Sequence, residues 1–128
     1  MADEERIVLI RRVCRRDQLT DGGLAVTFSI SRHGKSQAGF AFASSGAVFA
    51  YVNVCPHRGT PLDWQPGEVF DESGLYLICA THGAMFEPES GRCFAGPCQG
   101  AHLQRIPVDV IGDHVVLQHD VLSDFTDR

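Results

Sequence analysis

Two short segments each place a cysteine close to a histidine, and these two residue types together suit a metal. The segments are Cys55-Pro56-His57 and Cys79-Ala80-Thr81-His82, in a chain of 128 residues. Thiolate sulfur and imidazole nitrogen are ligands that zinc and iron–sulfur clusters take in proteins. The spacing therefore predicts one metal centre held by two loops. Its predicted ligands are Cys55, His57, Cys79 and His82.

A glycine follows each pair, Gly59 two residues after His57 and Gly83 directly after His82. Glycine permits tight turns and a close approach of the backbone. Such loops can aim N–H groups at a cluster, whose negatively charged sulfides need donors once they leave water. Two Cys and two His could also form a tetrahedral zinc site, but zinc motifs of that composition usually place like ligands together. The mixed pairs favour an iron–sulfur cluster over zinc, and over no metal at all.

The two segments resemble the two cluster-binding boxes of Rieske proteins. The resemblance rests on residues 55–62 (CPHRGTPL) and 79–86 (CATHGAMF). Residues 90–92 (SGR) and 96–97 (GP) look like the family's segment after the second box, including its proline loop beside the cluster. The resemblance covers roughly residues 40–118 and is specific in the boxes.

This resemblance implies one 2Fe–2S cluster of the Rieske type. In the family, two cysteines bind the inner iron and two histidines bind the outer iron. By position the cysteines are Cys55 and Cys79, and the histidines are His57 and His82.

The high-potential branch of the family differs from this chain at several positions. That branch carries an extra cysteine in each box, and the two form a disulfide. Here the corresponding positions hold Thr60 and either Ala80 or Thr81. The same branch has Ser and Tyr hydroxyls that donate to cluster sulfurs, where this chain has Ala84 and Phe86. Fewer donors stabilise the reduced cluster less, which implies a low potential.

Short apolar runs separated by turn residues predict an all-β domain. We expect strands at residues 7–14, 24–31, 39–43, 47–54, 75–78, 106–110 and 114–118, with hairpin turns at 44–46 and 111–113. The resemblance implies an antiparallel β-sandwich or barrel of the Rieske type. Residues 1–128 are expected to form one domain, with a small cluster-binding subdomain at about 55–100. That stretch is too long and too rich in Gly and Pro for an ordinary loop.

Three cysteines lie outside the boxes. Cys14 falls on a predicted strand and is expected to be a small core residue. Cys98 follows the Gly96-Pro97 step, so it is expected near the cluster as part of an apolar lid. A disulfide with Cys93 is disfavoured if the compartment is reducing.

The remaining histidines and the segment between the boxes are not predicted to bind the metal. The remaining histidines are expected to be surface or core residues without a ligand role; they are His33, His102, His114 and His119. Residues 63–74 form an insertion between the boxes, in which Trp64, Pro66 and Phe70 either pack on the subdomain or contact a partner.

Charge and hydropathy exclude some classes of function. The formal net charge is −5, and residues 59–91 contain no Lys or Arg. This balance disfavours nucleic-acid binding. No apolar run approaches the length of a membrane span, and no secretory signal is recognisable, so a cytoplasmic protein is expected.

The resemblance implies a one-electron carrier, the ferredoxin component between a flavin-dependent reductase and a terminal oxygenase. It would be a component of an oxidoreductase system and not a complete enzyme. One alternative is an integral Rieske-type small subunit of a larger reductase such as nitrite reductase. Another is a cluster sensor or interaction module.

Overall fold

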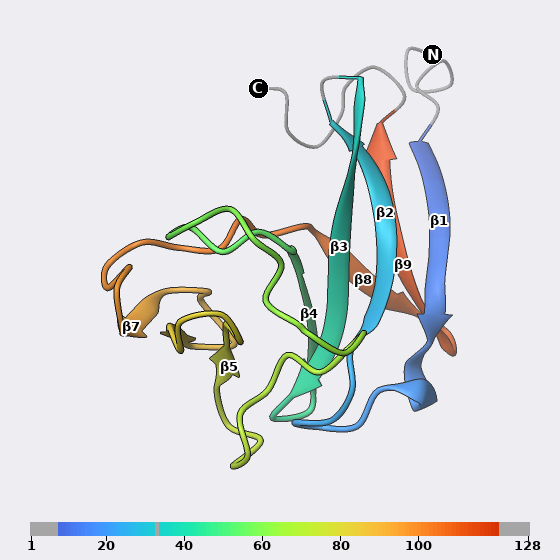
Figure 1. Cartoon of the computed structure of the whole chain (residues 1–128). Helices are drawn as coiled ribbons and strands as arrows, with labels where there is room; N and C mark the ends of the chain where they lie inside the picture. Colours follow the sequence, from blue (N-terminus) through green and yellow to red (C-terminus); the bar gives the residue numbers. More distant parts are fainter. Residues whose placement is uncertain (1–7, 33, 121–128) are drawn as a thin grey trace.

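The computed structural model describes residues 8–32 and 34–120, and these contain strands and turns without an α-helix (Figure 1). The strands are β1 (Val8–Arg15), β2 (Val26–Arg32), β3 (Lys35–Ser44), β4 (Ala47–Val52), β5 (Leu77–Ile78), β6 (Met85–Phe86), β7 (Cys93–Ala95), β8 (Val108–Ile111) and β9 (His114–Asp120), with a 3-10 turn, η1 (Arg16–Gln18), after β1. All strand pairs are antiparallel. The prediction of an all-β fold is confirmed.

The strands form three small sheets, with the orders β1-β9-β8, β2-β3-β4 and β5-β6-β7. The first two sheets face each other as a sandwich. At one edge β1 lies beside β2, where the Arg11 guanidinium donates to the carbonyl of Ser29 at 2.6 Å. At the other edge β8 lies beside β4. The third sheet belongs to a separate lobe, to the left in Figure 1, that contains both cysteine–histidine segments.

The sheet β2-β3-β4 is the middle layer of the molecule, and β3 shows why. Side chains alternate across a strand. Phe40 and Phe42 belong to the core shared with the lobe, whereas Ala41 and Ala43 belong to the cores that face β1-β9-β8. All four are at most 1% exposed. The lobe therefore packs on the aromatic side chains of Phe40 and Phe42, together with Tyr51 of β4.

Both predicted hairpin turns are present. Ser45 and Gly46 connect β3 to β4, and both have positive φ, at 52° and 82°. Two central residues with positive φ define the turn that matches the twist of a hairpin. The second turn connects β8 to β9 around Gly112.

Four expected strand starts differ from the structure by two residues or more: β2 begins at Val26, β3 at Lys35, β5 at Leu77 and β8 at Val108. Leu24 was expected on a buried strand face, but β2 begins at Val26 and Leu24 is 61% exposed. The backbone N–H of Ala25 donates to Gly67 in the lobe instead of to a neighbouring strand. Leu75 was expected to begin a strand, but β5 begins at Leu77 and Leu75 is exposed.

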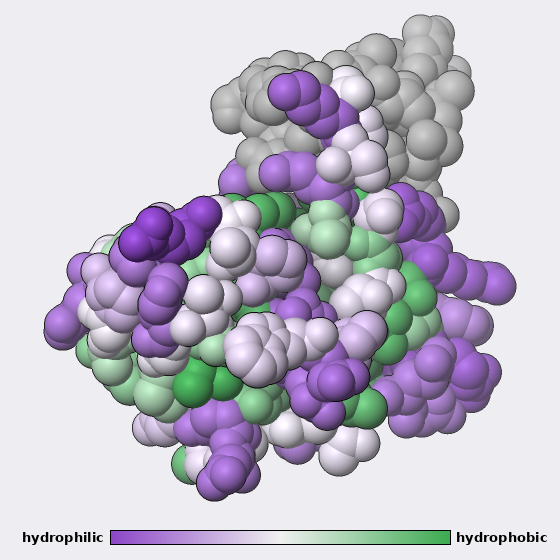
Figure 2. All heavy atoms as spheres, viewed as in Figure 1, coloured by the Kyte–Doolittle hydropathy of each residue, from purple (hydrophilic) through white to green (hydrophobic). Residues whose placement is uncertain are grey.

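The surface is mixed in character. Figure 2 shows hydrophobic residues in several small areas separated by hydrophilic ones on the face viewed in Figure 1. Within the described part of the chain, no helix has the length and apolar character needed to cross a bilayer.

Candidate metal centre

Two loops of the lobe share one hydrogen-bond pattern, although their sequences differ. In the first loop the Cys55 N–H donates to Thr60 O at 2.8 Å and the Gly59 N–H donates to Cys55 O at 2.7 Å. In the second loop the Cys79 N–H donates to Ala84 O at 2.8 Å and the Gly83 N–H donates to Cys79 O at 2.9 Å. Gly59 and Gly83 have almost equal φ values of 78° and 76°, in the region that favours glycine. The glycine that follows each pair is therefore required by the turn.

The loops bring the four predicted ligands together as two pairs. The side chains of Cys55 and Cys79 interact with each other and are only 2% and 1% exposed. The rings of His57 and His82 meet edge to face, with centroids 5.2 Å apart and planes at 76°. His57 is half-buried and His82 is exposed. The thiols thus lie inside the lobe and the imidazoles at its surface.

The Cys55 sulfur has the donors that a ligating sulfur needs. Burial raises the pKa of the Cys55 thiol, and the neighbouring Cys79 thiol raises it further. The backbone N–H groups of His57 and Arg58 donate to the sulfur and oppose that rise, because they stabilise the thiolate. N–H donors directed at sulfur are the interactions that stabilise an anionic iron–sulfur centre.

The donor set fits a two-iron cluster better than one metal ion. Among residues 8–32 and 34–120, no three His, Cys, Asp or Glu side chains converge to hold a single ion. A tetrahedral zinc site needs four ligands around one point, whereas here the two thiols and the two imidazoles form separate pairs. Two thiols and two imidazoles in separate pairs match a centre with two irons, one ligated by sulfur and the other by nitrogen. The buried hydroxyl of Thr60, in the first loop, has no hydrogen-bond partner among the described residues.

A network that sequence reasoning missed anchors the first loop. The Asn53 side chain accepts from the Leu62 N–H at 2.8 Å and donates to Asp63 Oδ1 at 2.9 Å. Asp63 Oδ2 accepts from the Gly67 N–H at 2.9 Å. Asn53 is 7% exposed. Through these hydrogen bonds its side chain joins the two ends of the loop that carries Cys55 and His57. The only sequence signal was a polar residue at the end of an apolar strand.

The same network connects the two loops. The carbonyl of Leu62, whose N–H is held by Asn53, accepts from the Ala80 N–H at 2.9 Å. Ala80 lies between the two predicted ligands of the second loop. The distance between the loops is therefore set by backbone contacts that do not depend on a disulfide, and the described cysteines are all free thiols.

Residues 93–101 cover the second loop. Gly96 lies directly against Ala84, where a Cβ on the glycine would come within 2.8 Å of the Ala84 Cα. Cys98 is 9% exposed and belongs to the same core as Cys55 and Cys79, in agreement with its expected place near the site. Ala84 and Phe86 are fully buried. Neither position offers a hydroxyl to this site.

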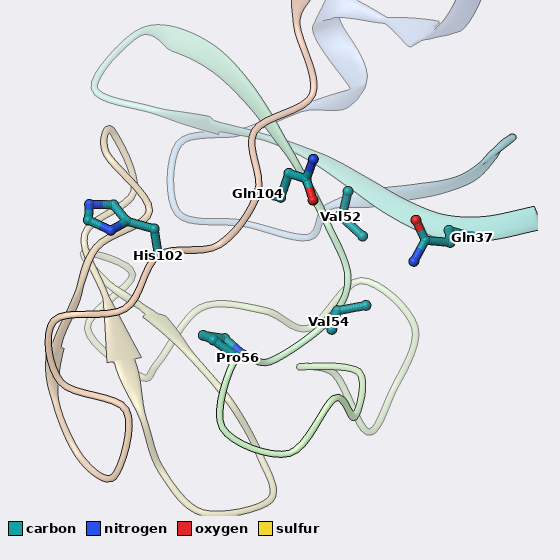
Figure 3. Close-up of a pocket in the computed structure, with 6 residues that line it drawn as sticks. All are labelled: Gln37, Val52, Val54, Pro56, His102 and Gln104. Atoms are coloured by element: carbon teal, nitrogen blue, oxygen red, sulfur yellow. The ribbon is translucent and has the colours of Figure 1, made fainter. Parts of the chain in front are cut away.

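A hollow of about 180 Å³ lies beside the first loop (Figure 3). Its walls come from β3, from the end of β4, from Pro56 and from the segment before β8. They are formed by Gln37, Val52, Val54, Pro56, His102 and Gln104. Pro56 separates the two predicted ligands of this loop, so the hollow and the site share one backbone segment.

The other sequence candidates lie as follows. Cys14 is buried in the core between the two facing sheets, as expected. Phe70 packs edge-on against Phe42, with ring centroids 5.4 Å apart, whereas Trp64 is 77% exposed. The prediction that the insertion packs on the subdomain is therefore confirmed for Phe70 and wrong for Trp64. His102 is exposed and His114 half-buried, while the side chains of His33 and His119 lie outside the described set.

Comparisons with known proteins agree with this geometry. The sequence profile of the Rieske 2Fe-2S domain family matches residues 10–120. Sphingomonas yanoikuyae B1 ferredoxin is similar in structure, with a TM-score of 0.64 and 24% identity over 84% of this chain and 96% of that chain. The ferredoxin of carbazole 1,9a-dioxygenase from Nocardioides aromaticivorans IC177 has a TM-score of 0.63 and 24% identity over 84% and 95%.

A third similar structure is the complex of reduced oxygenase and oxidised ferredoxin in carbazole 1,9a-dioxygenase. Its TM-score is 0.64, with 20% identity over 84% of this chain and 91% of that chain. The comparison with curated proteins gives no match. At these identities the structural likeness establishes the fold.

An antiparallel β-sandwich with a lobe that pairs two buried thiols with two surface imidazoles defines a class of iron–sulfur protein. The chain belongs to the Rieske 2Fe-2S domain family, whose profile covers most of its length. The family implies one Rieske-type 2Fe–2S cluster as the cofactor.

Proposed function

We propose that this protein is a one-electron carrier with a low-potential Rieske cluster, bound by Cys55, Cys79, His57 and His82. Residues 1–128 form one domain, with the cluster-binding subdomain at about 55–100. The core shared by the lobe and the sheet β2-β3-β4 supports the assignment of one domain.

The observation that carries the proposal is the arrangement of the two pairs of side chains. The thiols are buried, while the imidazole rings meet at the surface of the lobe. When bound, the cluster supplies reversible uptake of one electron. Cys55 and Cys79 would hold one iron inside the lobe, away from water. His57 and His82 would bind the other iron and provide the contact to a partner protein.

The residues around the thiols tune the site. The N–H groups of His57 and Arg58 donate to the Cys55 sulfur and stabilise its negative charge. Ala84 and Phe86 add no hydroxyl donor, although both are buried in the second loop. A reduced cluster carries one more negative charge, so fewer donors give a lower potential. This supports a place among carriers that deliver electrons at low potential.

The proposed partners are a flavin-dependent reductase as donor and a terminal oxygenase as acceptor. The support is by analogy, because one structurally similar protein is part of a complex of reduced oxygenase and oxidised ferredoxin. An integral small subunit of a larger reductase is the alternative. Its signature would be purification as a stoichiometric complex.

The test is reconstitution with purified partners. The isolated protein should show the visible and EPR spectra of a Rieske cluster and take up one electron per chain. Addition of a catalytic amount should then couple NAD(P)H oxidation by the reductase to turnover of the oxygenase. A protein that is reduced but never reoxidised by any oxygenase would contradict the carrier role.

A further inference from the structure

Cys93 and Cys98 are close together, and neither is among the proposed ligands. The two Sγ atoms are 3.0 Å apart, with the Cys98 thiol donating to Cys93. The Cys93 thiol in turn lies 3.2 Å from the carbonyl of Ala95. Cys93 is fully buried and Cys98 is 9% exposed. The contact is therefore held inside the lobe.

The backbone around the pair is fixed by its own hydrogen bonds. The Cys93 N–H donates to Ala101 O and the Gly100 N–H donates to Cys93 O, both at 2.8 Å. The Ala101 N–H donates to Cys98 O at 2.9 Å. These bonds close a small loop with both sulfurs facing each other. A disulfide has an S–S length of about 2.0 Å, so the sulfurs need to approach by only about 1 Å.

We propose that Cys93 and Cys98 are a modification site, a dithiol that a hydroperoxide oxidises to an intramolecular disulfide while the cluster remains bound. Cys98 reacts first because it keeps some exposure. Its sulfur attacks the terminal oxygen of the hydroperoxide, an S–O bond forms, the O–O bond breaks, and an alcohol or water leaves with the thiol proton. The product is a sulfenic acid on Cys98.

The second step joins the two residues. The Cys93 sulfur attacks the sulfur of Cys98, the S–S bond forms, the S–O bond breaks, and water leaves with the Cys93 proton. Overall the two thiols lose two electrons and two protons, and the hydroperoxide is reduced. The disulfide would close the loop that contains Gly96 and Pro97. That loop contacts Ala84 of the second box. Oxidation would therefore fix the loop in place over the site.

The surroundings predict a slow reaction. Cys93 is fully buried and Cys98 is only 9% exposed, so an oxidant has little access to either sulfur. The pair is therefore protected against brief exposure and responds to sustained oxidant.

Peptide mapping of the cluster-loaded protein tests the proposal. Cluster absorbance is followed during treatment with hydrogen peroxide, and the protein is then unfolded in acid with chelator and alkylated. Alkylation should fall from five thiols to three, with Cys93 and Cys98 recovered as one cross-linked peptide lighter by two hydrogen atoms. Cys14, which is buried in a different core, should remain alkylated and serves as the internal control.

Two variants sharpen the result. Cys98→Ser should leave Cys93 fully alkylated after the same treatment, whereas Cys14→Ser should still form the cross-link. The oxidised wild-type protein should also lose its cluster to a chelator more slowly than Cys98→Ser. Any of four results would overturn the proposal: full alkylation of both cysteines, irreversible oxidation of Cys98 without a bond, a bond to Cys55, or a bond that forms only after the cluster absorbance is lost. None of these depends on electron delivery to an oxygenase.

Discussion

His82 and His57 share the surface of the lobe but differ in exposure. His82 is exposed and His57 is half-buried, and their rings are in contact. A histidine at the surface can be replaced without opening a cavity in the core. Replacement of His82 therefore probes the ligand role more cleanly than replacement of Cys55 or Cys79, which are both buried.

His82→Ala should abolish the Rieske spectrum and lower bound iron, because one of the two proposed nitrogen ligands is lost and metal binding is coupled to folding of the loops. Iron content and EPR measure the effect. His102→Ala is the matched control, since His102 is also exposed but lies outside the two boxes. A full Rieske spectrum in His82→Ala would refute the ligand assignment.

Ala84→Ser should raise the reduction potential. A hydroxyl near the cluster would donate to sulfur and stabilise the more negative reduced state. If it favours that state by about 1 kcal/mol, a one-electron potential rises by roughly 40 mV. Phe86→Tyr should act in the same direction, provided that its buried ring has room for the hydroxyl.

Protein-film voltammetry measures this shift. Ala50→Ser is the control, because Ala50 is equally buried but belongs to the core that faces β1-β9-β8. A potential that stays constant or falls in both Ala84→Ser and Phe86→Tyr would refute the role of missing donors.

At the scale of elements, the two boxes were predictable from the sequence and their anchors were not. Residues 55–62 and 79–86 carry their information locally, in ligand spacing and glycine. The network of Asn53 and Asp63 joins residues across the ends of a loop, and a single polar residue gives no sign of its partner. The pairing of β1 with β9 is equally non-local, so it was not predictable, whereas the two hairpins were. The short strands β6 and β7 of the lobe were not expected either.

Exchange of Asn53 and Asp63 tests the anchor. Asn53→Asp alone places two carboxylates against each other and removes the amide donor, which should destabilise the lobe by about 1–3 kcal/mol. Asp63→Asn alone removes one acceptor oxygen and should also destabilise. The double exchange restores one amide facing one carboxylate, with an oxygen still available to the N–H groups of Leu62 and Gly67.

Denaturant unfolding and the rate of cluster loss are the measurements for this cycle. Recovery of stability in the double exchange, relative to both single variants, would demonstrate the paired role. Strictly additive losses would show that Asn53 and Asp63 act independently and do not jointly set the loop.

At the scale of the whole molecule, the net charge is −5, and its carboxylates differ in whether a cation lies beside them. Glu87 is held by Arg92 at 3.3 Å and by the Ser90 hydroxyl. Neither Glu68 nor Glu89, both exposed, has an ion pair with another described residue. The segment without Lys or Arg, residues 59–91, therefore exposes negative charge at Glu68 and Glu89, while the charge of Glu87 is partly neutralised.

The exposed carboxylates should attract a basic face of the partner. Reduction by a flavin reductase should therefore slow as ionic strength rises, because exposed charges are screened over about 8–10 Å at physiological salt. Charge reversal at Glu68 or Glu89 should slow reduction further and leave the cluster spectrum intact. Glu87→Gln should have less effect, since Arg92 already offsets that charge. Stopped-flow rates measure this. A rate that is flat or rises with salt would indicate apolar docking, for which exposed Trp64 is the first residue to replace.

Because β3 contributes side chains to both cores, it should also determine which parts of the molecule unfold locally. Its aromatic side chains belong to the core of the lobe and its alanines to the opposite core. Loss of the cluster removes a tie within the lobe but none between the strands of β2-β3-β4. Local opening should then follow these boundaries. In amide hydrogen exchange, removal of the cluster should speed exchange at Cys79 and Gly83 by orders of magnitude, while Ala41 and Ala43 continue to exchange only through global unfolding. Equal acceleration at both places would mean that the lobe and the sandwich unfold as one cooperative unit.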